Sequence, residues 1–401
     1  MNREDEEFTL QLWRRVRTII DQQAGRDDGD HTVQAPEPTL DEAFACIRNA
    51  AGHRREFVAC SLVAISTWAE DNSYLQTATL CVESAAYLTP GDPAPAIIAG
   101  RLRRRTADYD RAEGWYLRGA ALARSLQKWE LFIQALLWHG FLHFQKAEYS
   151  EAERKYRSAG RAARRYGRRA LAGVAHHNLL TLASDLGSYA EGERHALRAL
   201  SLYPVYFPRV PHLVHDYAFL LARNGFYTAA LKLLDHVEPL ISAVQERVVV
   251  VGNIARAAGG ARRADRFETA ADEVVRLASV SDENASRGLL GAAEGAHSLG
   301  QASRAVDLAA RAMDLALRRS DNEVQRLARV LIERTERQES PPADRAAPSG
   351  YAALARECVD RLGRWASRPR GQAARMLRKH EPKQPPPSET AASTGWRRGA
   401  T

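Results

Sequence analysis

Residues 136–160 decide the fold of this chain and have the sequence LLWHGFLHFQKAEYSEAERKYRSAG. Within this stretch small and large residues alternate at fixed spacing, at Gly140, Tyr149, Ala152, Tyr156 and Ala159. The same alternation stands 40 positions earlier, at Gly100, Tyr109, Ala112, Tyr116 and Gly119. A repeat of this period is typical of a helical solenoid, in which each unit buries its apolar face only by stacking on its neighbours.

The repeat extends beyond these two copies. From about residue 57 to 320 the sequence contains about seven two-helix units, each with a small residue in its second helix. These small residues are Ala78, Ala112, Ala152, Gly192, Ala230, Ala270 and Ala305. Small residues let two helices approach closely, and an aromatic residue three positions earlier in units two to six fills the space beside them. Because every periodic segment has the helical period, the sequence predicts an all-α protein.

This pattern resembles the tetratricopeptide repeat (TPR), with a Trp/Leu/Gly/Tyr signature in the first helix and Ala/Phe/Ala/Pro in the second. Residues 136–160 and 187–204 (GSYAEGERHALRALSLYP) carry the resemblance best, and it covers roughly two thirds of the chain. Several units are 38 to 40 residues long, which resembles the longer repeats of bacterial regulators and kinesin light chains. The resemblance implies a right-handed superhelix of about seven helix-turn-helix units, with one long concave surface for a partner.

Composition indicates a soluble, cytoplasmic protein. Apolar residues make up 45% of the chain, mean hydropathy is -0.41, and no apolar run approaches the ~20 residues that a membrane helix needs. The acidic N-terminus, MNREDEEFTL, lacks the apolar core of an export signal. The four cysteines have no metal-like spacing and suit a reducing cytosol. Arginine greatly outnumbers lysine, which we interpret as the coding bias of a GC-rich, bacterial genome.

Three regions are predicted along the chain. Residues 1–56 hold N-terminal helices and a polar loop, and residues 57–336 hold the repeat array. Residues 337–401 hold a linker, one amphipathic helix and a basic, disordered tail. Ten basic and two acidic residues from position 361 onward account for the whole net charge of +8. The rest of the chain is formally neutral, so the net charge alone does not indicate that the array binds nucleic acid.

No motif indicates an enzyme or a cofactor. The sequence has no phosphate-binding loop, no nucleophile elbow and no paired-carboxylate constellation. His139 and His143 stand four residues apart on one predicted helix, which is a spacing that suits two metal ligands. The nearest acidic residue in the sequence, Glu148, falls in the following turn, and there is no HExxH motif. Packing or hydrogen bonding between helices is therefore the favoured interpretation, and no metal site is predicted.

The candidate site is the concave groove. In the fold that the chain resembles, the first helices of successive units line this groove. Their groove positions, transferred to this chain, are Arg101, Arg104, Arg105, Trp138, Phe141, Phe144, His177, Asn178, His215, Phe219, Arg223 and Arg256. Aromatic and histidine side chains then form a centre flanked by arginines. The resulting hypothesis is a non-catalytic protein-interaction scaffold whose partner is a peptide or helix with acidic and apolar side chains. The alternative is that the aromatics are core and the arginines are solvated.

A second basic run offers a different function. Residues 153–169, ERKYRSAGRAARRYGRR, lie on a predicted second helix and the turn beyond it, which face the convex side in the resembling fold. The arginines from Arg157 to Arg169, together with the basic tail, could bind the phosphates of a nucleic acid. A solvated helix face in an arginine-rich chain is the simpler interpretation. A nucleic-acid partner is therefore the second hypothesis, and no membrane partner is expected.

Overall fold

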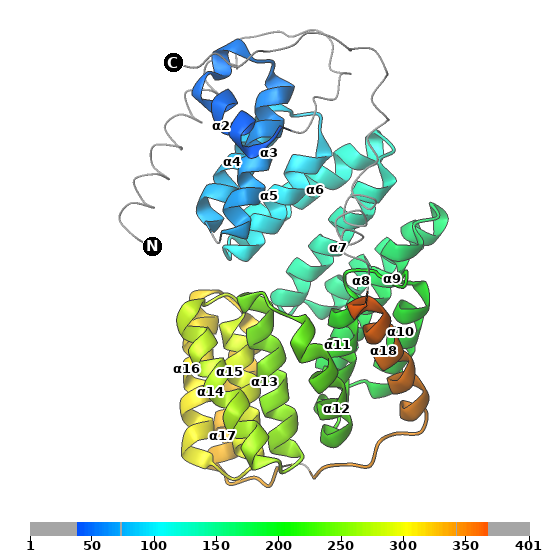
Figure 1. Cartoon of the computed structure of the whole chain (residues 1–401), viewed down its shortest axis with the longest axis vertical. Helices are drawn as coiled ribbons and strands as arrows, with labels where there is room; N and C mark the ends of the chain where they lie inside the picture. The colour runs from blue at the N-terminus through cyan, green and yellow to red at the C-terminus, as the bar shows by residue number, and fades with distance from the viewer. Residues whose placement is uncertain (1–37, 73, 342, 368–401) are drawn as a thin grey trace.

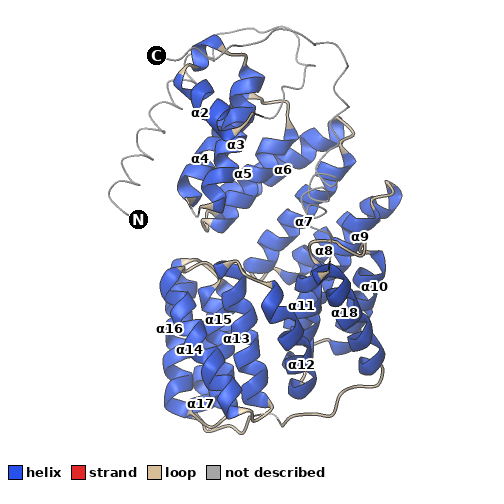
Figure 2. Cartoon of the chain, in the orientation of Figure 1, coloured by secondary structure: helices blue, strands red, loops and turns tan. Residues whose placement is uncertain are grey.

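The computed structural model describes residues 38–72, 74–341 and 343–367. All regular structure in these residues is helical, with seventeen α-helices and two short 3-10 helices (Figure 2). Residues 1–37 of the predicted N-terminal region and the part of the predicted basic tail beyond residue 367 lie outside the described residues. None of the described helices is long and apolar enough to cross a membrane.

Fourteen of the helices form seven consecutive pairs, each packed against the next. The pairs are α3 (Arg55–Asp71) with α4 (Leu75–Leu88), α5 (Pro93–Arg105) with α6 (Tyr109–Ser125), α7 (Trp129–Gln145) with α8 (Tyr149–Arg165), α9 (Arg169–Asp185) with α10 (Tyr189–Leu202), α11 (Val210–Arg223) with α12 (Tyr227–Val237), α13 (Val244–Gly260) with α14 (Ala264–Val280), and α15 (Ala285–Ser298) with α16 (Ala302–Arg318). The flanking elements are α2 (Leu40–Arg48), η1 (Ala50–Gly52), η2 (Glu238–Leu240), α17 (Asn322–Glu336) and α18 (Tyr351–Ala366). The predicted all-α array of about seven repeat units is confirmed.

The repeated glycine–tyrosine spacing corresponds to a contact inside a helix pair. Gly140 on α7 faces the fully buried Tyr156 on α8, and Gly100 on α5 faces the fully buried Tyr116 on α6. A Cβ atom added at Gly140 would lie only 2.6 Å from Cε1 of Tyr156, and one added at Gly100 would lie 2.7 Å from Cε1 of Tyr116. Glycine therefore lets the paired helices approach closely, and the tyrosine ring occupies the space that a side chain at the glycine position would fill.

Most turns inside the pairs contain one residue in the left-handed region. Gly187 and Gly225 occupy this position in the fourth and fifth units, with φ of 70° and 79°. Ala107 and Ala147 occupy it in the second and third units. The backbone of one turn residue thus reverses the chain, and the small residue of the second helix then packs in the core. Ala112, Ala152 and the other predicted small residues of the second helices are buried.

The array curves until its second unit touches its last helices (Figure 1). Arg105, at the end of α5, pairs with Glu283 just before α15, with 2.7 Å between Nη2 and Oε2. Arg319, after α16, donates through Nη2 to the carbonyl of Arg105 over 2.6 Å, and its own carbonyl accepts from the Tyr109 hydroxyl over 3.1 Å. We call these three interactions the closing contacts. They connect α5 and the start of α6 to the residues that precede α15 and follow α16.

The segment between α17 and α18 returns the chain to the middle of the array. Its Asp344 accepts a hydrogen bond from the backbone N–H of Tyr227 over 2.8 Å, at the start of α12. The backbone N–H of Arg345 donates to the carbonyl of Gly225 over 2.8 Å. Beyond this segment, α18 packs on α11 and α12, where the buried Arg361 donates to backbone carbonyls that end α10. The predicted linker is therefore anchored to the array between residues 343 and 345.

Candidate binding groove

The concave face contains a cavity of about 780 Å³. First helices of successive units supply most of its walls, namely α5, α7, α9, α11 and α13, together with the segment between α10 and α11. The rest of the lining consists of Tyr156 on α8, Ile241, Asn284 and Arg287 on α15. The wall formed by α7 is aromatic and apolar, with Leu137, Trp138, Phe141 and Phe144. The other walls combine polar side chains, such as Asn178 and Asp216, with apolar ones, such as Leu171 and Val249.

The twelve predicted groove residues divide between the cavity wall and the packing behind it. Six line the large cavity: Arg101, Trp138, Phe141, Phe144, Asn178 and His215. Arg223 lines a second cavity of about 420 Å³. The other five lie outside both linings: Arg104, Arg105, His177, Phe219 and Arg256. A periodic stripe places a residue on a helix face, but the neighbouring helices decide whether that face is covered.

The aromatic wall is held in place by Arg104. Its guanidinium lies 4.6 Å from the centroid of the Phe141 ring and 5.7 Å from that of Trp138, and its Nη1 donates to Gln145 over 2.7 Å. The rings of Phe141 and Phe144 are stacked at 5.9 Å between centroids. Phe144 is only 2% exposed, whereas Trp138 and Phe141 are partly exposed. Phe144 is thus a core residue behind the wall, and Trp138 and Phe141 are its accessible surface.

A polar network is organised around Asp216 on α11, which the sequence analysis did not single out. His177 Nε2 lies 2.8 Å from one carboxylate oxygen of Asp216, and His215 Nδ1 lies 2.8 Å from the other. The remaining ring nitrogens meet Tyr203 at 2.9 Å and Asn253 at 2.9 Å. Both imidazoles therefore donate to the same carboxylate and accept on their far side.

These contacts set the charges of the network. Burial alone would raise the pKa of Asp216, but hydrogen bonds from His177 and His215 hold that pKa far below its ordinary value. Burial in turn lowers the pKa of His177, so this imidazole stays neutral at pH 7. The large cavity therefore contains the negative charge of Asp216, and the hydrogen bonds around this carboxylate connect α9, α11 and α13.

Four of the five predicted arginines already have acidic partners, and Arg223 is one of them, with 3.6 Å between its Nη1 and Oε1 of Glu294. Arg101 forms a two-point contact with Glu70, whose carboxylate also meets Arg105. On the other flank, Arg256 pairs with Glu294 and lies 4.9 Å from the centroid of the Phe219 ring. Their partners come from other repeats, up to 178 positions away in the sequence in the case of Arg105 and Glu283. A pattern within one helix could not have identified them.

Two further residues line the cavity: His212, which the helical stripe of α11 also predicts, and Arg209, which was missed because it precedes that helix. Arg209 lines the cavity from the segment before α11 and makes no salt bridge within the described residues. His212 contacts Glu246 through Nε2 at 3.2 Å, while its Nδ1 is buried without a hydrogen-bond partner among the described residues. Of these two side chains, the Arg209 guanidinium is the one without a salt bridge, and it is therefore the one suited to a ligand in the cavity.

The second cavity is strongly charged. Arg223, Arg326 and Arg334 line it together with Glu294 and Asp185, the last residue of α9. Burial raises the pKa of Asp185 to about 6, despite the opposing effect of nearby arginines. This carboxyl group therefore changes its charge close to physiological pH.

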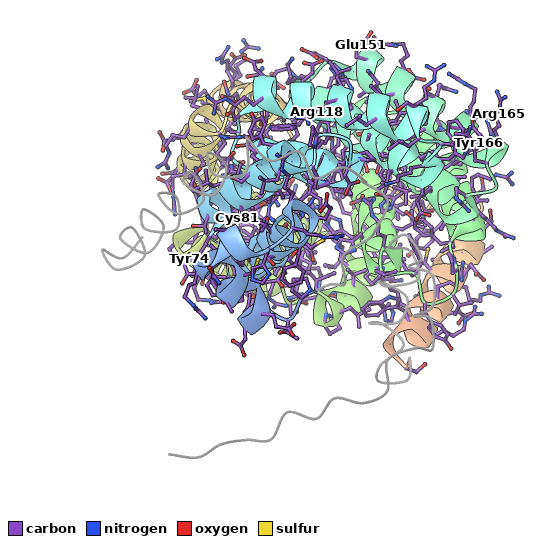
Figure 3. The ribbon with its side chains drawn as sticks, turned by 90° about the horizontal axis from the view of Figure 1, so that it is seen from above. Tyr74, Cys81, Arg118, Glu151, Arg165 and Tyr166 are labelled. Carbon is purple, nitrogen blue, oxygen red and sulfur yellow. The ribbon has the colours of Figure 1, made fainter. Side chains whose placement is uncertain are left out.

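The basic run of α8 lies away from both cavities. Its Arg161, Arg164 and Arg165 are exposed, and Figure 3 shows Arg165 and Tyr166 at the outer edge of the molecule. The Tyr166 ring stacks on Trp129 at 4.0 Å between centroids. The arginines thus lie on the surface opposite the groove.

Comparisons with known proteins agree on the fold. No family model matches the chain, and no curated protein matches its sequence. Among solved structures, a Rap protein complexed with Competence and Sporulation Factor is 12% identical, with a TM-score of 0.56, and the match covers 80% of this chain and 99% of that one. A tetratricopeptide repeat protein from Parabacteroides merdae is 14% identical, with a TM-score of 0.44, and the match covers 69% of this chain and 98% of that one. The apo form of RapI is 10% identical, with a TM-score of 0.42, and the match covers 69% of this chain and 97% of that one. The chain has the fold of the tetratricopeptide repeat proteins, as its repeat pattern predicted.

Proposed function

We propose that this chain is a non-catalytic scaffold that binds a peptide or short helix in the large concave cavity. The observation that carries the proposal is a space of about 780 Å³ with an aromatic wall on α7 and polar groups on its other walls. Apolar surface combined with a few convergent polar groups is typical of a ligand site. The match to a Rap protein in complex with Competence and Sporulation Factor supports a bound partner in a fold of this kind.

The side chains of the cavity define the chemistry of the ligand. Trp138 and Phe141 are suited to an apolar anchor, because they are rigid and partly exposed. Arg209 has no acidic partner within the described residues, so it is suited to a carboxylate of the ligand. The amide of Asn178 can pair with a peptide backbone. The preferred ligand therefore carries apolar and acidic side chains, and Arg209 is its main charged contact.

The test uses peptides selected from a displayed random library against the full chain. Phe141→Ala should weaken the selected peptides by about 2 kcal/mol, or roughly 30-fold, because an aromatic anchor is lost. Arg209→Gln should weaken them and flatten the salt dependence of binding. Arg165→Gln, on the outer surface, is the matched control and should bind like the parent. Dissociation constants come from calorimetry, and the melting temperature of each variant is measured in parallel.

Selected peptides that bind Phe141→Ala as tightly as the parent would contradict the proposal. A nucleic-acid function then becomes the better candidate, because Arg161 and Arg164 are exposed on α8 and make no salt bridge within the described residues. The same panel decides between the two. A nucleic-acid function is favoured if the chain binds a single-stranded RNA and loses this binding when Arg161, Arg164 and Arg165 are all replaced by Gln. Peptide binding that does not depend on the groove residues would support the same conclusion.

A further inference from the structure

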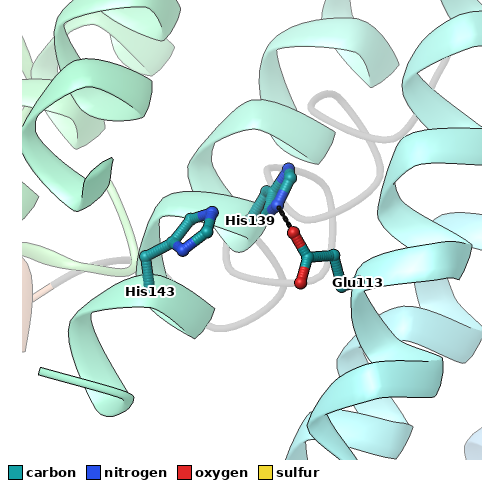
Figure 4. A group of neighbouring side chains, drawn as sticks. All are labelled: Glu113, His139 and His143. Atoms are coloured by element: carbon teal, nitrogen blue, oxygen red, sulfur yellow. Dashed lines mark hydrogen bonds and ion pairs between the residues drawn. The ribbon is translucent and has the colours of Figure 1, made fainter. Parts of the chain in front are cut away.

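A second group of side chains converges between α6 and α7, outside the linings of both cavities. Glu113 reaches from α6 toward His139 and His143, which stand one turn apart on α7 (Figure 4). One ligand atom from each of the three residues lies within 4.8 Å of the other two. Both imidazoles are buried, and Glu113 is partly exposed. The carboxylate that the sequence seemed to lack is therefore supplied by the preceding repeat.

The spacing of these atoms is close to that of a metal site. Zinc binds imidazole nitrogen and carboxylate oxygen at about 2.0–2.2 Å, so two ligand atoms on one tetrahedral ion lie roughly 3.3 Å apart. Nε2 of His139 and Oε1 of Glu113 are 3.1 Å apart. The His143 ring lies 4.6 Å from that of His139 between centroids. A small rotation of the side chains brings all three ligand atoms around one ion.

A carboxylate outside the ligand set orients one of the histidines. Glu148, in the turn after α7, lies 2.6 Å from Nδ1 of His143. A carboxylate on Nδ1 holds the proton there and leaves the Nε2 lone pair for a metal, which is the usual arrangement of metal-bound histidine. On the opposite side, Nζ of Lys155 lies 3.1 Å from Nδ1 of His139. The lysine charge opposes a bound cation, so its removal should strengthen metal binding.

We propose that Glu113, His139 and His143 form a zinc site with water as the fourth ligand. Two nitrogen ligands and one oxygen ligand are a set that zinc accepts. The ion would connect α6 to α7 and so the second repeat unit to the third. The site lies between α6 and α7, while Trp138 and Phe141 of α7 line the groove. The proposal is therefore independent of what the groove binds.

Zinc binding to the full chain, after treatment with a chelator, is measured by isothermal titration calorimetry. We expect one zinc ion per chain at micromolar concentration, and a melting temperature that rises with zinc concentration. Glu113→Gln and His143→Asn should abolish both effects, and Glu148→Gln should weaken binding at least tenfold, as losses of an orienting carboxylate typically do. Lys155→Met should bind zinc more tightly than the parent.

The matched control is His176→Asn. His176 and His195 also form a close pair, with 3.0 Å between their Nδ1 atoms, but the nearest carboxylate, that of Glu191, is 4.0 Å from His195. This variant should bind zinc like the parent. Circular dichroism in the absence of zinc checks that each variant is folded. Absence of zinc binding by the parent, equal affinity in folded Glu113→Gln and His143→Asn, or an equal loss in His176→Asn would each overturn the proposal.

Discussion

Two carboxyl groups, one in each cavity, have pKa values that their surroundings shift in opposite directions. Asp216 is mostly buried, with 24% of its side chain exposed, and two histidine donors keep it ionised. Asp185 is also largely buried and accepts no comparable pair of donors, so burial raises its pKa to about 6. The same residue type is therefore a fixed charge in the large cavity and a titrating group in the second cavity.

The raised pKa of Asp185 predicts a specific pH dependence of stability. The folded chain binds this proton more tightly than the unfolded chain, whose carboxyl has its ordinary pKa of 3.8. Stability therefore decreases as pH rises from about 4 through 6, and the full cost remains above pH 6. Asp185→Asn removes that cost. The variant should match the parent near pH 4 and be more stable by about 2 kcal/mol at pH 7.

Urea unfolding of both chains at pH 4, 5.5 and 7 measures this difference in the free energy of unfolding. Asp314→Asn, on the exposed face of α16, is the matched control and should follow the parent at every pH. A constant difference between Asp185→Asn and the parent across this range would mean that the carboxyl does not titrate as inferred.

Which residues face the groove was partly accessible from sequence. The helical period places Trp138 and Phe141 on one face of α7, which lines the large cavity, because the residues that share a helix face depend only on local spacing. The acidic partners of the groove arginines could not be predicted from the sequence. Glu283 lies 178 residues from Arg105, and their contact depends on the curvature of the whole array. For the same reason, the sequence did not show that Glu113 of α6 lies beside the two histidines of α7.

Among the elements, α12 illustrates how a helix depends on a distant segment. Phe226, at its N-cap position, supplies no side-chain cap. Asp344 provides the missing acceptor, with hydrogen bonds of 2.8 Å from the N–H of Tyr227 and 3.2 Å from that of Thr228. The sequence predicted a linker at this point because its composition is rich in proline and polar residues. It could not show that one of those residues caps a helix 116 positions earlier.

Removal of this cap should loosen α12 without unfolding the array. Asp344→Ala leaves two backbone N–H groups without their acceptor, and loss of an N-cap typically costs about 1 kcal/mol. We expect faster hydrogen exchange at the first turn of α12 and in α18, which packs on it, with little change in α5 and α6. Asp344→Asn should restore most of the protection, since its side-chain oxygen still accepts. An equal increase of the hydrogen-exchange rate in all helices of Asp344→Ala would contradict a local role for this cap.

At the scale of the whole molecule, the closing contacts connect the second unit of the solenoid to its last helices. The side chains of Arg105 and Glu283 are only 12% and 16% exposed, so salt screens their attraction weakly. Arg105 also meets Glu70, and this ties α3 and α5 to the segment that precedes α15. Since repeat arrays are joined mainly through neighbours, such contacts between distant repeats control how far the groove can open.

Weakening this junction should therefore change the shape of the molecule more than the stability of its repeats. In Glu283→Gln the charge is lost, Arg105 keeps Glu70, and the unfolding free energy should fall by only about 1 kcal/mol. The radius of gyration from small-angle X-ray scattering should increase as the second unit separates from the last helices. Asp314→Asn, which removes an exposed acid on α16 outside the junction, should leave the radius unchanged. A compact Glu283→Gln, with the parent's radius at both low and high salt, would show that repeat stacking alone sets the curvature and that the closing contacts do not control the opening of the groove.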